Sequence, residues 1–205
     1  MQKMQFILFS LIILMCGYPR LRTIYGYNEV HYAVYVGNID NVKQECRKKP
    51  ALINEKDSEG KTPLDLAIIF NQPEIALWLI ENGAIIKIRK NYCCWNSPEF
   101  LGKKGVIYDA KPIHIASYKG NNVIIKKLIE NGEKINSEIK ISPLVFAVAG
   151  GKQDTVDYLI NLGYSVNSKD VDVNPLVAAV KMKDKFMIVF LMSKGAEINN
   201  YDKAG

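Results

Sequence analysis

The segment TPLDLAIIFNQPEIALWLIENGA, residues 62–84, decides the fold of this chain. It opens with Thr62-Pro63, a pair typical of a helix start, because the threonine side chain can cap free N–H groups and proline suits the first helical position. Asn71 follows nine residues after Thr62, where a residue that tolerates the left-handed conformation ends a short first helix. Apolar residues then recur at helical spacing as far as Gly83, which stops a second helix. The segment therefore predicts two short helices joined by a tight turn.

The same pattern occurs five times along the chain. The copies start at Asn28, Thr62, Lys111, Ser142 and Asn174. Proline follows the start in four copies, and glycine or asparagine stands nine residues after the start in four. An internal repeat of this length predicts an array in which each helix pair buries its apolar face against the next pair.

These offsets resemble the ankyrin repeat, whose pattern is T-P-L-H-x-A, then a glycine, an apolar second helix and G-A-x-x-N. The resemblance covers residues 28–205 and implies an all-α repeat solenoid of stacked helix-turn-helix repeats with β-turn fingers. It also implies protein recognition, without enzymatic activity. The expected repeats are 28–56, 57–88, 106–137, 138–168 and 169–200.

The copies depart from that pattern at several positions. Asp65, Val145 and Val177 stand where the motif has histidine, Lys183 replaces the mid-repeat glycine, and Lys111 replaces the capping threonine. Losing a helix cap costs about 1 kcal/mol. We therefore expect a modestly stable array that depends on stacking between neighbouring repeats.

One junction is longer than the others. The step from Thr62 to Lys111 is 49 residues, whereas the other steps are 31 to 34, and the excess lies at 88–105. This segment is expected to be an elongated finger whose Tyr92 and Trp95 contact a partner, or else a tolerated surface insertion. Its adjacent Cys93-Cys94 lack the spacing of a zinc knuckle, so neither a metal nor a cofactor is expected.

The N-terminus has a different composition. Lys3 precedes an apolar run from Phe6 to Met15, which matches the h-region of a signal peptide over residues 1–16. Because the run ends at Cys16-Gly17, it resembles a bacterial lipoprotein signal, in which Cys16 would be lipidated. Export to the periplasm, cell envelope or medium is expected. The alternatives are a cut after Gly17, or an unprocessed cytoplasmic chain whose first helix packs on the array.

The resemblance also implies a binding groove, lined by the fingers and by positions late in each first helix. Those helix positions are Tyr35, Val36, Ile69, Phe70, Tyr118, Lys119, Ala149, Gly150, Lys181 and Met182, and the finger positions are Lys61, Ala110, Ile141 and Val173. The expected partner is a protein segment with apolar anchors and some acidic character. Alternatively, Ile69 and Phe70 simply pack under the long finger.

The second helix of the last copy is unusually apolar. Phe186, Val189 and Phe190 stand where the preceding copy has Asp154, Asp157 and Tyr158. A terminal repeat should have a polar outer face. This face is expected to dock onto a second copy of the chain, a partner or a membrane, unless the array has simply been shortened.

Composition narrows the function classes. The chain is 48% hydrophobic and 23% charged with a net charge of +6, so neither disorder nor a multi-span membrane protein is indicated. The sequence has no paired catalytic carboxylates, phosphate-binding glycine loop or nucleophile constellation. A protein-interaction module is the leading interpretation, which includes masking a neighbouring protein. In the alternative, the basic and aromatic finger binds nucleic acid or an anionic surface.

Overall fold

The computed structural model describes residues 24–86, 111–132, 142–167 and 173–198, and these segments contain α-helices and one 3-10 helix but no strand. The chain divides into two compact units, an N-terminal unit, Met1–Ile85, and a C-terminal unit, Ile86–Gly205. The N-terminal unit contains α2 (Glu29–Tyr35), α3 (Ile39–Lys48), η1 (Pro50–Asn54), α4 (Pro63–Ile69) and α5 (Pro73–Glu81). The C-terminal unit contains α6 (Pro112–Lys119), α7 (Asn122–Glu130), α8 (Pro143–Ala149), α9 (Gln153–Asn161), α10 (Pro175–Lys181) and α11 (Lys185–Ser193).

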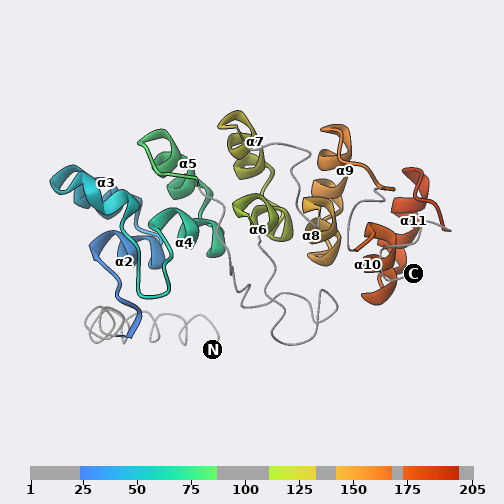
Figure 1. The fold of residues 1–205 in the computed structure, drawn as a ribbon, viewed down its shortest axis with the longest axis horizontal. Helices are drawn as coiled ribbons and strands as arrows, with labels where there is room; N and C mark the ends of the chain where they lie inside the picture. The colour runs from blue at the N-terminus through green and yellow to red at the C-terminus, as the bar shows by residue number, and fades with distance from the viewer. Residues whose placement is uncertain (1–23, 87–110, 133–141, 168–172, 199–205) are drawn as a thin grey trace, which may run out of the picture. The chain divides into compact units, whose positions relative to one another are not determined.

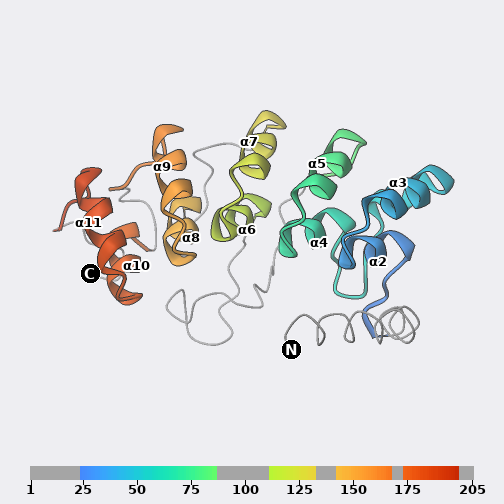
Figure 2. The ribbon, with the colours of Figure 1, turned by 180° about the vertical axis from the view of Figure 1, so that it is seen from behind.

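Each unit consists of two helical layers. In the N-terminal unit, the first helices α2 and α4 lie side by side below the second helices α3 and α5 (Figures 1 and 2). The C-terminal unit repeats this arrangement, with α6, α8 and α10 below α7, α9 and α11 (Figures 1 and 2). The predicted fold class, stacked helix-turn-helix repeats, is therefore confirmed.

The first helices begin at the predicted capping residues. The Ser142 hydroxyl accepts a hydrogen bond from the Leu144 N–H at 3.2 Å, and Asn174 Oδ1 accepts one from the Leu176 N–H at 2.8 Å. Such bonds satisfy backbone donors that have no partner inside the helix. Capping side chains thus fix the start of the first helix in four copies, whereas Lys111 makes no such bond at the start of α6.

The helix turns confirm the predicted left-handed position nine residues after each cap. Gly37, Gly120 and Gly151 have φ between 64° and 78°, and Asn71 has φ 55°. Lys183 adopts the same conformation, with φ 57°. A side chain with a Cβ costs roughly 1–2 kcal/mol there, so the repeat geometry, rather than the preference of lysine, determines this turn.

Small buried residues allow the first helices to pack closely. Ala33, Ala67, Ala116, Ala147 and Ala178 are all buried, and each occupies the same or a neighbouring position of its copy. Longer apolar side chains from the second helices complete the core. The largest fully buried side chains there are Leu79, Ile124, Ile125, Leu128 and Leu159. Burying a side chain of this size stabilises the fold by about 1.5–3 kcal/mol.

Two asparagines connect successive repeats. Asn54 donates to the Gly83 carbonyl at 3.0 Å and accepts from the Ile85 N–H at 2.8 Å. Asn167 forms the same pair of bonds in the C-terminal unit, donating to the Gly195 carbonyl and accepting from the Glu197 N–H. Each asparagine therefore holds the loop that follows the second helix of the next copy.

Candidate functional site

The N-terminal unit contains a row of aromatic side chains that follows α2 and reaches α4. The Tyr25 and Tyr27 rings lie 5.6 Å apart between centroids, and Tyr27 stacks on His31 at 5.6 Å. Tyr35 lies 6.3 Å from Tyr27 and meets Phe70 edge-on at 5.4 Å. Such edge-to-face geometry is favoured because the positive edge of one ring contacts the negative face of the other. The row therefore holds Tyr35 and Phe70 in fixed positions.

The two ends of this row differ in exposure. Tyr27 is buried, and burial, followed by the nearby Asp57 carboxylate, raises the pKa of its hydroxyl. At the other end Phe70 is 39% exposed and Val36 is 43% exposed, while Tyr35 and Ile69 are half-buried. The predicted positions in this unit therefore form an accessible apolar surface on a rigid aromatic base.

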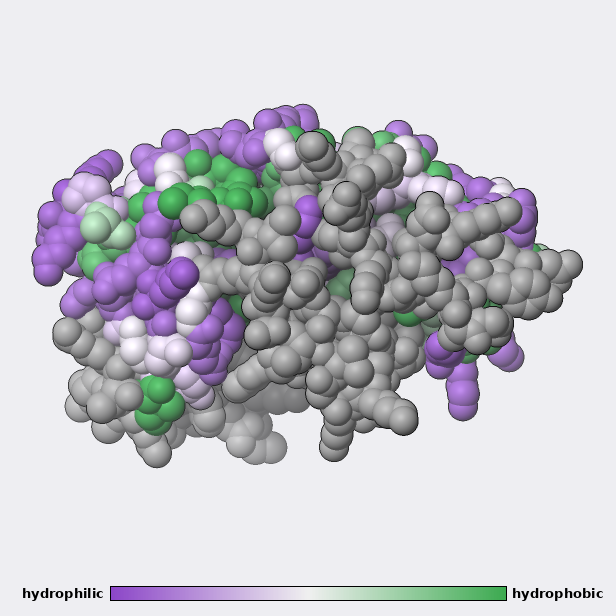
Figure 3. All heavy atoms as spheres, in the orientation of Figure 1, coloured by the Kyte–Doolittle hydropathy of each residue, from purple (hydrophilic) through white to green (hydrophobic). Residues whose placement is uncertain are grey.

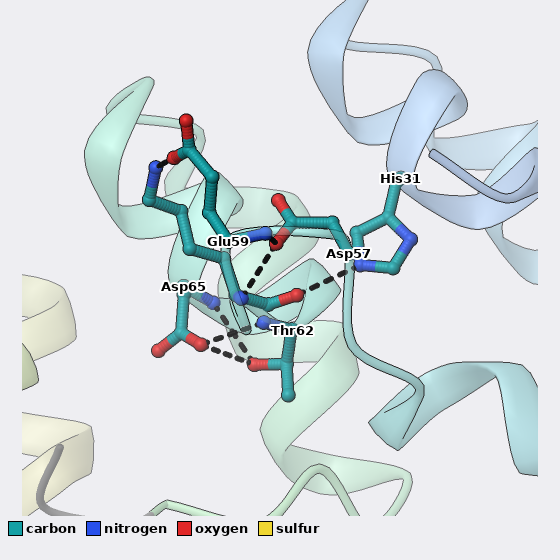
Figure 4. Close-up of polar contacts among 6 residues, drawn as sticks. His31, Asp57, Glu59, Thr62 and Asp65 are labelled. Atoms are coloured by element: carbon teal, nitrogen blue, oxygen red, sulfur yellow. Dashed lines mark hydrogen bonds and ion pairs between the residues drawn. The ribbon is translucent and has the colours of Figure 1, made fainter. Parts of the chain in front are cut away.

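The finger is the segment between η1 and α4, and hydrogen bonds to Asp57 hold its backbone together (Figure 4). Asp57 Oδ1 accepts the N–H groups of Glu59 and Lys61 at 2.9 and 2.7 Å, and the Asp57 N–H donates to the Lys61 carbonyl. Burial raises the pKa of the Asp57 carboxyl, whereas these N–H donors act in the opposite direction. The Glu59 and Lys61 side chains form an ion pair at the finger tip.

His31 joins this finger to α2. Its Nε2–H donates to the Lys61 carbonyl at 3.0 Å (Figure 4). Its Nδ1 accepts the Asn28 N–H at 3.4 Å. Burial lowers the pKa of the imidazole, with the Lys61 carbonyl acting in the opposite direction. The neutral ring therefore caps α2 at one nitrogen and holds the finger with the other, a position that suits packing rather than metal binding.

Residues 25–27 lie directly beside this finger. The Ser58 N–H donates to the Tyr25 carbonyl at 2.9 Å, and Asn28 Nδ2 donates to Glu55 at 3.0 Å. Gly26 has φ 64°, and a Cβ there would lie 2.9 Å from the Ser58 nitrogen. Our sequence interpretation did not include Tyr25 and Tyr27. Their position just before the cap of the first copy, where a finger is expected, was the available signal.

The C-terminal unit presents a more polar surface at the corresponding positions. Lys119 and Lys181 are exposed, and Tyr118 is half-buried. Two of the positions expected in the groove are not accessible, because Ala149 and Val173 are buried. The expectation that they face a partner is therefore wrong.

Gly150 explains why α8 is different. A Cβ on Gly150 would lie 2.2 Å from the Tyr118 carbonyl oxygen, far inside van der Waals contact. The small residues Ala149-Gly150 therefore allow α8 to approach α6, and they contribute to the core instead of leaving space for a ligand. Lys152 packs along this junction, where its side chain lies against Gly120.

Further apolar surface lies outside the first helices. In Figure 3 a hydrophobic area over α5 is bordered by hydrophilic residues, and Leu77 and Trp78 of this helix are half-buried. On α11, Phe186 is 87% exposed and Val189 is 67% exposed. Phe190 is half-buried instead, and the Lys194 Nζ lies 5.3 Å from its ring centroid.

Several predicted features lie outside the described residues. These are the signal at 1–16 with Cys16, the finger at 88–105 with Tyr92, Trp95 and Cys93-Cys94, and the groove positions Ala110 and Ile141. Within the described segments, no helix is long and apolar enough to span a membrane, and no three His, Cys, Asp or Glu side chains are grouped to bind a metal. Cys46 is buried in α3, and burial raises the pKa of its thiol to about 11.

Comparison with known families agrees with this geometry. A family model for ankyrin repeats (3 copies) matches residues 5–90 and 113–202. The chain belongs to the ankyrin repeat family. Ankyrin repeats are protein-interaction modules, and the class of protein that the fold defines is therefore a binding protein of this kind.

Individual relatives share parts of the chain. An alpha-latrocrustotoxin, Lt1a, of Latrodectus tredecimguttatus is 30% identical over 67% of this chain, but the match spans only 9% of the toxin. The 26S proteasome regulatory subunit p28 of Saccharomyces cerevisiae is 26% identical over 86% of this chain and 74% of its own length. An ankyrin repeat protein of Rickettsia felis is 27% identical over 87% of this chain and 41% of its own length.

Proposed function

We propose that this chain is a non-enzymatic module that binds a segment of another protein on the surface formed by its fingers and first helices. The observation that carries the proposal is the pair of exposed apolar side chains, Val36 and Phe70, beside the ordered Tyr35 ring. Rigid aromatic anchors surrounded by apolar contacts are the usual centres of binding energy in protein interfaces.

The C-terminal unit contributes a different chemistry to this binding. Lys119, Lys152, Lys181 and Lys183 are exposed near the turns that end its first helices. Lysines at the edge of an interface favour acidic partners and accelerate association more than they increase affinity. On this proposal the N-terminal unit favours apolar side chains of a partner, and the C-terminal unit favours acidic groups.

Matched variants test this proposal. The chain carrying Val36→Glu and Phe70→Glu should lose the proteins that the wild type captures from an extract of its source, with a loss of affinity of at least 10-fold. Val123→Glu is the control, because Val123 is 57% exposed on the second helix α7. Equal capture by all three folded proteins would exclude this surface.

The α11 face is a second candidate contact surface, separate from the first helices. Phe186 and Val189 project from α11, and their exposure supports association with another protein surface. Surface apolar residues occur singly on most proteins, but a contiguous group of them marks an interaction site more often.

We also propose that residues 1–16 direct export to the periplasm, cell envelope or medium, with lipidation of Cys16. A separate part of the proposal is that the 88–105 finger contacts a partner. The intact mass of the expressed chain tests export: a product starting at Cys16 with added acyl mass supports it, and an unprocessed cytosolic chain opposes it. Binding of the finger to nucleic acid is the alternative, and strong salt dependence would be its mark.

A further inference from the structure

The last described helix pair concentrates the exposed apolar side chains of the C-terminal unit. Six large apolar residues between 173 and 198 are exposed, whereas Val123 is the exposed one in 111–132 and none is found in 142–167. The six are Val180, Met182, Phe186, Val189, Met192 and Ile198. Exposed apolar surface gathered in one helix pair favours a specific contact over random surface variation.

Three of these residues form a stripe along α11. Phe186, Val189 and Met192 recur every three residues and are exposed, while Met187 and Leu191 on the other side of the helix are buried. Residues three and four apart lie on one helix face. The stripe therefore has Val189 at its centre, with an aromatic ring at one end and a flexible thioether at the other.

The charges around this stripe are distributed unevenly along the helix. Lys183 and Lys185 are exposed at the start of α11, and Glu197 is exposed beyond its end. No basic residue stands in the last turn of α11, where the helix dipole places partial negative charge. Lys194 follows that turn, but its ammonium group pairs with Asp157 of α9.

We propose that the α11 stripe is the interface of a symmetric dimer, in which α11 packs antiparallel against α11 of a second copy of this chain. A two-fold axis at Val189 places Phe186 of one copy on Met192 of the other, a favourable aromatic–thioether contact. It also places Lys183 and Lys185 beside Glu197 and the carboxyl end of the partner helix. A parallel pair would instead bring the lysines of both copies together.

This inference rests on the proposed role of the α11 face as a protein contact, and it is independent of the first-helix surface. A two-fold interface uses the same patch twice, so the patch must be complementary to itself. Here lysines lie at one end of the apolar stripe and a glutamate at the other, so each end of one copy faces the opposite charge on the second. An acidic partner or an anionic membrane would be attracted by the lysines but would be repelled by Glu197. The second copy is therefore the occupant that fits both ends.

Sedimentation and light scattering of the full chain over a range of concentrations test the dimer. The wild type should approach twice the chain mass of 23.1 kDa. Phe186→Lys and Val189→Lys should each give monomers, because each substitution is present twice in a symmetric interface. A 10-fold loss of dimerisation affinity per side therefore becomes a loss of about 100-fold. Val123→Lys adds the same charge to α7 and should remain a dimer. Circular dichroism confirms that all four proteins are folded.

Charge exchange and cross-linking test the antiparallel register. Lys185→Glu should weaken the dimer, and Glu197→Lys added to it should restore the affinity. With Cys16, Cys93 and Cys94 replaced by serine, Val189→Cys should form a disulfide with itself. Phe186→Cys should form one only when mixed with Met192→Cys.

A monomer at every concentration, or a Val189→Lys variant that still dimerises, would overturn the proposal. Self-linking of Phe186→Cys would overturn the antiparallel register. Failure of the dimer would leave the other surface untouched, because Phe186→Lys should still capture the same partner proteins as the wild type. Conversely, the chain carrying Val36→Glu and Phe70→Glu should lose partner capture but still dimerise. That result would show that partner binding and dimerisation use separate surfaces.

Discussion

The two units use the same repeat, yet they present different surfaces at the end of their first helices. The N-terminal unit places Tyr35 and Phe70 in edge-on contact, with Val36 exposed beside them. The C-terminal unit has Lys119 and Lys181 exposed, and Gly150 between them is pressed against the backbone of α6. The same position of the repeat is therefore an exposed phenylalanine, Phe70, in one copy and a glycine packed on a neighbouring helix, Gly150, in another. The difference shows that the repeat determines the backbone position of a residue but not the surroundings of its side chain.

The largest effect should come from Gly150. In Gly150→Ala the new Cβ would meet the Tyr118 carbonyl, and relieving this overlap requires α8 to move away from α6. The substitution should lower the free energy of unfolding by about 3 kcal/mol. Gly151→Ala is the neighbouring control, since it meets no atom and should cost only about 1 kcal/mol for its positive φ. Urea denaturation of both variants checks this, and equal losses would contradict close packing of α6 and α8.

Asp65 provides the next largest effect, in the N-terminal unit. Its Oδ2 accepts both the Thr62 N–H at 2.7 Å and the Thr62 hydroxyl at 2.8 Å, and both groups are buried. Asp65→Ala should cost about 2 kcal/mol, because buried donors lose their acceptor. Asp65→His should cost less, since His114 accepts the N–H of Lys111 at 2.8 Å in the same register. A greater loss for histidine than for alanine in thermal denaturation would refute this equivalence.

Asn54 and Asn167 have the same role in the two units, so their replacement should have the same effect on stability. Each side chain makes two hydrogen bonds to the backbone of the next repeat and is partly exposed. Asn54→Ala and Asn167→Ala should each cost about 1 kcal/mol. The check is hydrogen exchange of the Ile85 and Glu197 amides, which should each accelerate only in the variant of its own unit. Acceleration of both amides by one substitution would mean that the units do not open independently.

The smallest effect is the pH dependence that His31 gives to the N-terminal unit. Burial lowers the pKa of His31 below its usual 6.5, so the unfolded chain binds the proton more readily than the folded chain. Stability due to His31 is complete above that value and falls as the pH decreases through it. The raised pKa of Asp57 acts in the opposite direction, in a window that ends near 3.8. Denaturation at pH 7 and slightly below 6 checks this, and His31→Gln should reduce the difference in stability between the two pH values.

The sequence alone determined the local structure of this protein. The caps at Ser142 and Asn174 and the left-handed turn at Asn71 follow from hydrogen bonds and backbone preferences within a few residues, whereas the left-handed turn at Lys183 follows from its position in the repeat. Because these interactions are short in range and recur at fixed offsets, five imperfect copies identify the repeat. Even the replacement of histidine by Asp65 keeps the same acceptor in place.

Only the tertiary structure decided which positions are accessible. Ala149 and Lys181 occupy the same position of their repeats, yet Ala149 is buried beside the close contact of Gly150 with α6, and Lys181 is exposed. The row formed by Tyr25 and Tyr27 likewise depends on a finger from the next repeat, held by the Ser58 N–H. Exposure is a property of neighbours that are distant in sequence, and for that reason no offset within a single repeat encodes it.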